Sequence, residues 1–270
     1  QMEVQMGKKE YMLEHGHKII FDPDSHRYVK DNQYIIGLSS VLGYLSAPAL
    51  ENWKRAQLMN AVKESMEQEE IPLDTIDRIL INAKANVNKR QDNILSIGKV
   101  VHELVEKWLK KEKFTLPKNE VHLNCLKKFQ KFWRKNKLKL MESEKILYSE
   151  LGFAGTLDII EKNPEDNFWL IDIKTSSGFF LTHIYQLHGY KYAYEEQTGK
   201  KINKMYIVRL PKSDDNFEAR EFSFQKKHQN AFLGLLNCHK SQLLFNEQSR
   251  KYNQQSRLIK QRSKTNGKLK

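Results

Sequence analysis

The sequence predicts an α/β fold, in which helices flank a mixed central β-sheet that starts with an antiparallel hairpin and follows an N-terminal helical region. The predicted helical region is 47–137, because the apolar residues there recur at helical spacing and helix breakers are few. Strand-like runs follow at about 144–150, 153–161 and 167–174, separated by turn residues. A helical pattern near 182–197 and the strand-like runs "KMYIVRLP" and "EAREFSF" then give the element order of an α/β protein.

The remaining elements are predicted from turn residues, helix breakers and local composition. In residues 1–46, "DPDS" and "KDN" interrupt short β-type runs, which predicts a small hairpin or meander. Pro72 marks the start of a helix within 47–112, and another helix covers about 118–136. Residues 138–246 would form the core of the fold, ending in the helix "HQNAFLGLLNCHKSQLLFN". From Glu247 the chain has eight Lys or Arg against one Glu, so we expect 247–270 to be a basic flexible tail on one compact domain.

Composition bounds the class of protein. With 270 residues, of which 39% are hydrophobic, the chain can bury a core. It has no run of eighteen apolar residues and no signal-peptide core, so we expect an intracellular, cytoplasmic protein without a membrane partner. A mitochondrial location is the alternative if a leader has been removed. Two distant cysteines form neither a disulfide framework nor an iron–sulfur site. The net charge of +13 favours a polyanionic partner such as DNA.

Two strand-like runs each carry one aspartate, Asp158 in "TLDII" and Asp172 in "FWLIDIKT". Strand alternation places Asp172 and Lys174 on one face, roughly 6–7 Å apart along the chain. If the two strands pair, Asp158 lies close to Asp172, and close carboxylates are costly unless a cation joins them or one is protonated. A divalent metal is the simplest neutralising group, and a structural ion pair between strands is the alternative.

These residues belong to a wider pattern. "GKVVHELVE", "GTLDII", "LIDIKTSS" and "YQLHGYKYAY", in this order, resemble the PD-(D/E)xK nuclease superfamily, and within it the RecB-type branch that includes phage exonucleases and the mitochondrial genome maintenance exonuclease. The similarity runs from about residue 17 to 210, and it implies a restriction-endonuclease-like core. Upstream, "GLSSVL" followed by "ENW" is similar to the family's "SVTxxL…W" segment, with Gly37 and Ser39 where Ser and Thr are usual.

The resemblance implies a metal site. Asp158, Asp172 and the backbone carbonyl of Ile173 would hold one or two Mg²⁺ or Mn²⁺ ions, which are hard cations suited to oxygen ligands. Lys174 would orient or deprotonate the attacking water and stabilise the developing charge. His102, in the family's "G-x-x-x-H" element, would reach the metal, whereas the zinc-protease motif is excluded because residue 106 is Glu. An ordinary helix histidine is the alternative.

Other residues are candidates for supporting roles. Glu150 would add a carboxylate at a strand end, or be merely solvated there. Gln186 and Tyr190 match the family's "Q-x-x-x-Y" element and share one helix face, unless Tyr190 is simply a buried tyrosine. The candidates for contact with nucleic acid are Ser39, Trp53, Thr175 and Ser176. A further basic stretch interleaves aromatics with lysines. One interpretation is a basic face with aromatic platforms for unpaired bases, but the period favours aromatics in the core and lysines in solvent. Its residues are Lys127, Lys128, Phe129, Lys131, Phe132, Trp133, Arg134, Lys135 and Lys137.

The sequence therefore predicts a metal-dependent deoxyribonuclease that hydrolyses phosphodiester bonds. We expect an exonuclease on single-stranded DNA or duplex ends, active in replication, recombination or repair and with partner proteins from those processes. Two alternatives stay open. One is a structure- or site-specific endonuclease on the same core, and the other is a nuclease-like DNA-binding module without catalysis.

Overall fold

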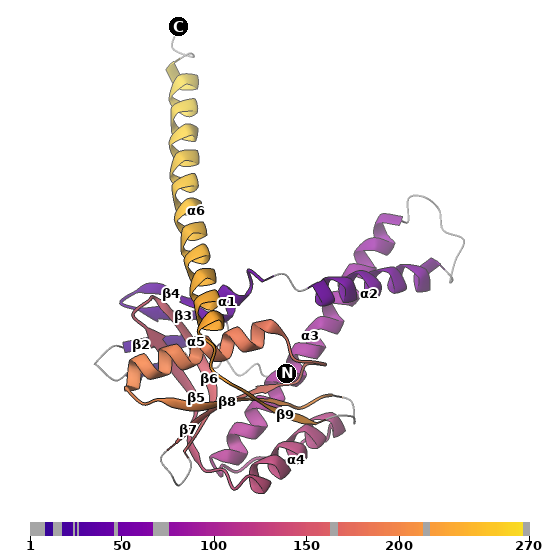
Figure 1. Ribbon diagram of the computed structural model, residues 1–270. Coiled ribbons are helices and arrows are strands. Elements are labelled where there is room, and N and C mark those ends of the chain that lie inside the picture. The colour runs from indigo at the N-terminus through magenta and orange to yellow at the C-terminus, as the bar shows by residue number, and fades with distance from the viewer. Residues whose placement is uncertain are drawn as a thin grey trace.

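A mixed nine-stranded sheet with helices on both sides forms the molecule (Figure 1). The computed structural model describes residues 9–12, 18–23, 25, 27–45, 48–66, 76–162, 167–212 and 217–266. The predicted fold class is confirmed: the sheet contains parallel and antiparallel pairs, and the helical region precedes its central strands.

The N-terminal strands form an antiparallel meander, as the interrupted β-type runs predict. β1 (Lys9–Met12) pairs with β2 (Lys18–Asp22), which pairs with β3 (Arg27–Lys30), which pairs with β4 (Gln33–Gly37). Asp31 and Asn32 turn the chain between β3 and β4 with φ of 51° and 61°, values typical of a tight hairpin turn and well tolerated by Asp and Asn. β4 then joins the central sheet through a parallel pair with β6.

The central strands follow the order that the sequence predicts. β5 (Leu140–Ser149), β6 (Phe153–Lys162) and β7 (Phe168–Lys174) are antiparallel neighbours. α5 (Leu181–Thr198) then crosses one face and leads into β8 (Ile202–Arg209), which is parallel to β7. β9 (Glu218–Phe222) closes this end of the sheet.

Two apolar cores cover the two faces of the sheet. On one face, α5 and the start of α6 (Lys226–Asn266) pack on the strands through side chains such as Leu187, Tyr194 and Phe232. On the other face, the end of α3 (Ile76–Leu109) and the helix α4 (Glu120–Lys135) pack through side chains such as Val105 and Phe129. The prediction for α4 is confirmed, because its aromatics face the core and most of its basic side chains are exposed.

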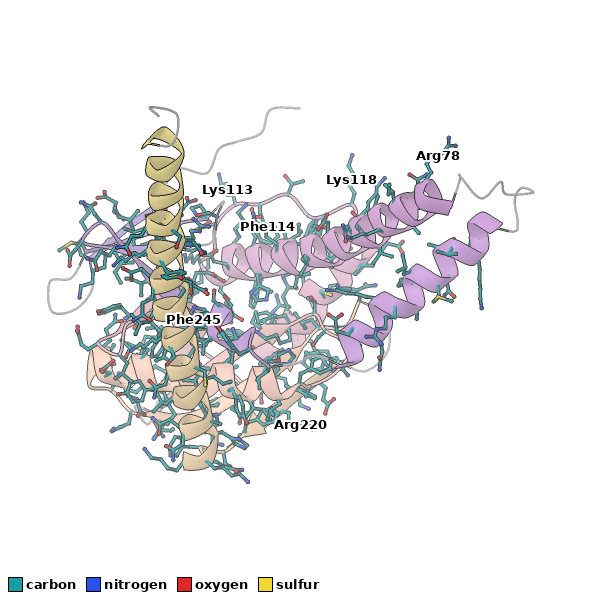
Figure 2. All side chains as sticks on the ribbon, turned by 90° about the horizontal axis from the view of Figure 1, so that it is seen from above. Arg78, Lys113, Phe114, Lys118, Arg220 and Phe245 are labelled. Atoms are coloured by element: carbon teal, nitrogen blue, oxygen red, sulfur yellow. The ribbon has the colours of Figure 1, made fainter. Side chains whose placement is uncertain are left out.

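The helical region contains α1 (Leu38–Leu42), α2 (Pro48–Met66) and α3 (Ile76–Leu109). α2 and the first part of α3 contact each other and project from the sheet as an arm (Figure 1). Arg78 lies at the outer end of this arm (Figure 2). Pro72, the predicted helix start, lies outside the described residues.

The C-terminal segment differs from the prediction. Residues 247–266, where we expected a flexible tail, are helical and continue α6 (Lys226–Asn266), which stands out from the sheet as one long helix (Figures 1 and 2). The segment has few apolar residues to bury, yet from Leu235 to Asn266 it contains no Gly or Pro and is rich in Gln, Lys and Arg, which favour helix. Residues 267–270 lie outside the described part. Among the described helices, none has the length and apolar character that crossing a bilayer requires.

Candidate metal centre

Asp158 lies where β6 and β7 part from each other. The last paired residues of these strands are Ile159 and Ile171, and beyond them the side chain of Asp158 reaches across the gap. Its Oδ2 accepts a hydrogen bond of 2.6 Å from the backbone N–H of Ile173. The carboxylate thus replaces a ladder hydrogen bond, and its Oδ1 is left to face other groups.

Asp172 and Lys174 form an ion pair on the neighbouring strand, as strand alternation predicts. Lys174 Nζ lies 2.6 Å from Asp172 Oδ2, and the aspartate is 1% exposed. Burial raises the pKa of the Asp172 carboxyl to about 6, because the cost of dehydration and the nearby charge of Asp158 outweigh the attraction of Lys174. Asp172 Oδ1 is buried and has no hydrogen-bond partner within the described part of the chain. It is therefore an acceptor that a cation would satisfy.

α3 brings His102 to this gap from the face of the sheet that α3 and α4 cover. A methyl group on Gly98, one turn earlier, would lie 3.2 Å from Thr175 Oγ1, so the small residue lets the helix approach the end of β7. His102 Nε2 lies 3.1 Å from the carbonyl oxygen of Ile173, and Nδ1 lies 3.5 Å from Asp158 Oδ1. Burial alone would lower the pKa of His102, but the charge and hydrogen bond of Asp158 outweigh it and raise the pKa to about 9.

The structure adds a carboxylate that our sequence analysis missed, Glu144 on β5. Ligand atoms of His102, Glu144 and Asp158 all lie within 4.8 Å of one another, so the three residues could hold a metal ion. Glu144 has a φ of 48°, and the pairing of β5 with β6 passes from Ser143 to Lys145 without it. A strained backbone at one position of a strand is typical of functional sites. Burial, with a contribution from Asp158, raises the pKa of Glu144 to about 8.

The register of the hairpin decides between Glu144 and Glu150. Ser149 pairs with Phe153, Lys145 with Leu157 and Ser143 with Ile159, so Glu144 is the residue that faces Asp158. Glu150 lies in the turn, is exposed, and donates its backbone N–H to Glu196 Oε2. Five strand residues separate the turn from Asp158, a distance of about 16 Å. The structure therefore does not bring Glu150 to the metal residues, whereas counting back from Asp158 through the turn would have found Glu144.

Gln186 and Tyr190 border the site on the α5 side. Gln186 Nε2 donates a hydrogen bond of 3.0 Å to the hydroxyl of Tyr190, which is 6% exposed. A methyl group on Gly155 would lie 2.8 Å from the Tyr190 ring, so this glycine lets the ring pack on β6. Burial raises the pKa of Tyr190 well above its usual value, and Asp158 and Asp172 raise it further. The phenol is therefore a neutral donor close to both carboxylates.

The four candidates for contact with nucleic acid lie in different places. Ser39 is exposed on α1, and Trp53 lies in α2 with a side chain outside the described part of the structure. Thr175 contacts the helix at Gly98, and Ser176 donates a hydrogen bond to the carbonyl of Gly178. Their role stays a prediction.

The donor set fits a divalent cation. It combines carboxylate oxygens with one imidazole, and the orphaned Asp172 Oδ1 lies beside it. Oxygen donors suit Mg²⁺ and Mn²⁺, and an imidazole suits the softer Mn²⁺ better. A cation would also favour the ionised form of Glu144, whose pKa burial raises.

Comparisons with known proteins add two structures. The chain matches no protein-family model and no curated protein. Among solved structures it is similar to SSO0001, with 13% identity and a TM-score of 0.33 over 71% of this chain and 85% of that one. It is also similar to a protein from Eubacterium rectale described as a candidate exonuclease, with 9% identity and a TM-score of 0.38 over 78% of this chain and 80% of that one. At these TM-scores the function has to be argued from the site.

Proposed function

We propose that this protein is a metal-dependent nuclease that hydrolyses the phosphodiester bonds of DNA. One observation carries the proposal. His102, Glu144 and Asp158 converge within 4.8 Å at the gap between β6 and β7, and beside them Lys174 is held 2.6 Å from the buried Asp172. Carboxylates, an imidazole and a lysine at the parting of two strands are costly for stability and suited to phosphoryl chemistry.

The metal residues would be His102, Glu144, Asp158, Asp172 and the carbonyl of Ile173. A bound Mg²⁺ or Mn²⁺ would supply a Lewis acid for the phosphate and lower the pKa of a water molecule. The chain's own contribution is to hold these ligands in place. The N–H of Ile173 fixes the carboxylate of Asp158, and the pairing around Glu144 turns its side chain toward Asp158.

Lys174 would act on the reacting groups. Its ammonium is paired with the buried Asp172, and 18% of its side chain is exposed. It can therefore reach a substrate while the aspartate restrains it. It would orient the attacking water and stabilise the negative charge that develops on the phosphoryl group. Tyr190, positioned by Gln186, would donate its hydroxyl hydrogen to the same region.

DNA as the substrate is supported by charge. The net charge of +13 favours a nucleic-acid backbone, since lysine and arginine displace counterions from phosphates. Action on single strands or duplex ends, in replication, recombination or repair, is what the resemblance to RecB-type exonucleases implies.

The test uses linear and circular single-stranded DNA with Mg²⁺, with Mn²⁺ and with a chelator. We expect cutting of the linear strand only, and only when a metal is present. Cutting of both the linear and the circular DNA would favour an endonuclease on the same core. Binding of DNA without cutting under any condition would contradict the proposal and favour a non-catalytic module.

A further inference from the structure

A groove runs along the free edge of β5, next to the metal residues. It has a volume of about 510 Å³, within the range of roughly 300–1,000 Å³ typical of small-molecule sites. Seven consecutive residues of β5, 140–146, line it, together with Tyr11, Met12, Lys110 and Gln197. Among the described strands β5 pairs only with β6, and at its other edge the backbone N–H of Tyr148 donates a hydrogen bond to Oε1 of Gln197, which also lines the groove.

The groove adjoins the metal centre. Ser143 and Glu144 line both this groove and the smaller pocket that contains His102 and Asp158. Tyr11 lines the same groove as Glu144. Burial raises the pKa of its phenol, and the charges of Glu106, Lys110 and Glu144 also act on it. A ligand in the groove would therefore contact Glu144 directly and be separated by it from His102 and Asp158.

The lining suits a neutral, flat, partly apolar group more than an anion. Its two lysines are already paired, Lys110 with Glu106 and Lys145 with Glu142. Much of the remaining lining is apolar, with the aromatic ring of Tyr11 and two adaptable methionines, Met12 and Met141. A nucleobase has this chemistry, since its faces stack on aromatic rings and its polar edge forms hydrogen bonds.

We propose that this groove binds the base and sugar of the nucleotide whose phosphate lies at the metal residues, with Tyr11 as the stacking platform. The choice of ligand rests on the proposed nuclease function. The phosphate would lie beyond Glu144, next to His102 and Asp158, and the base would lie against Tyr11 and the residues of β5 that line the groove.

The probe is 2′-deoxyadenosine 5′-monophosphate, with 2-deoxyribose 5-phosphate as the ligand that lacks a base. Calorimetric titration, with Mg²⁺ and with chelator, would measure the affinity of the full chain and of two variants. We expect Tyr11→Ala to weaken binding of the nucleotide by about 5- to 150-fold, which is the usual worth of one stacked base. Tyr34→Ala removes a tyrosine that is 72% exposed on β4 and outside the groove, and should bind as the wild type does.

A second pair of variants covers the case in which Tyr11→Ala does not fold. Met12 is 72% exposed in the groove, so its substitution should not disturb the core. We expect Met12→Glu to weaken nucleotide binding at low salt, through repulsion of the phosphate, more than Met12→Gln does.

The outcomes separate the two proposals. If the wild type cuts no DNA but binds the nucleotide in a Tyr11-dependent way, the groove is supported and the nuclease function is contradicted. If the wild type cuts DNA while Tyr11→Ala and Tyr34→Ala bind the nucleotide equally, the groove proposal is overturned. It is also overturned if the sugar phosphate binds the wild type as tightly as the nucleotide does.

Discussion

The site residues are a poor choice for stability and a good one for holding a cation. Asp158 and Asp172 are buried, and Glu144 adds a third carboxyl whose pKa of about 8 means that it keeps a proton at neutral pH unless a cation displaces it. His102 and Lys174 supply two compensating charges, which balance Asp158 and Asp172 but leave none for an ionised Glu144. The function proposed for these residues thus explains an arrangement that packing alone does not favour.

Asp172→Asn and Lys174→Ala should each abolish cleavage. The substitutions remove a metal ligand and the cation that stabilises developing charge, so we expect losses of roughly a hundredfold or more in kcat. DNA affinity should change little, because phosphate contacts elsewhere on the basic chain supply most of it. The measurement is single-turnover cleavage at saturating Mg²⁺, with DNA binding and thermal unfolding as controls. A variant that still cuts at the wild-type rate would refute its residue's assigned role.

At the scale of single elements, helix α5 fixes the geometry of the site because it approaches the sheet closely. Gly189 on α5 packs against Leu38 and Phe232, and a methyl group there would lie 2.8 Å and 2.9 Å from their side-chain atoms. These neighbours are fully buried and have little room to move.

Two glycines inside helices should respond in opposite ways to the same substitution. Gly189→Ala should destabilise the fold by about 1–3 kcal/mol, through overpacking. Gly234→Ala, on α6, should stabilise it by about 0.5–1 kcal/mol, because nothing lies within 4 Å of the added methyl group and alanine favours helix. Chemical denaturation measures both. Equal effects of the two substitutions would show that α5 does not pack as closely against Leu38 and Phe232 as these distances indicate.

His188 should make the joint between α5 and α6 sensitive to acid. Its Nε2 accepts a hydrogen bond from the backbone of Gln225, and burial lowers its pKa below the ordinary value of 6.5. Below pH 6.5 the unfolded chain therefore binds a proton that the folded chain excludes, so this stability is present at higher pH and lost as the pH falls.

We expect the stability advantage of wild type over His188→Gln to shrink between pH 7.5 and pH 5. The contributions of the other histidines cancel in the difference between the two melting temperatures, except for the repulsion between His188 and His228, which lowers the pKa of His188 and so acts in the same direction. A difference that stays constant or grows on acidification would contradict this role for His188.

Much of the fold could be predicted from sequence, because each strand and helix has a local signal. The alternation of "FWLIDIKT" placed Asp172 beside Lys174, and the helical period of α4 separated its aromatics from its lysines. Glu144 was missed because its placement depends on the hairpin register, which is found only by counting through the turn, and on a φ of 48°, which no local pattern shows. The extent of α6 was also missed. The polar, basic composition after Glu247 indicates that the segment is not buried, but it does not indicate that the segment is not helical.

At the scale of the whole molecule, basic charge is carried on parts that project. α6 extends the described chain to Asn266, and the arm of α2 and α3 extends it in another direction (Figure 1). From Glu247 to Lys270 the sequence has eight basic residues and one acidic residue. Such a segment attracts phosphates by counterion release without taking part in chemistry.

Deleting residues 248–270 should weaken DNA binding at moderate salt and flatten the dependence of log K on log salt. The slope should fall by about 0.7–0.9 for each phosphate contact that is lost, while the cleavage rate at saturating DNA stays the same. Identical slopes for the full and shortened chains would show that the segment does not touch DNA. A collapse of the maximal rate would show that it belongs to the catalytic fold.

The most direct test of the metal centre compares two glutamates that lie six residues apart. Calorimetric titration of Mn²⁺ into the wild type, Glu144→Gln and Glu150→Gln would measure whether Glu144 is a ligand. Glu144 lies within ligand distance of His102 and Asp158, whereas Glu150 is exposed in the turn. We predict that Glu144→Gln loses about tenfold or more in Mn²⁺ affinity and that Glu150→Gln binds as the wild type does. Equal affinities in all three proteins, or no saturable binding to the wild type, would contradict a metal centre at these residues.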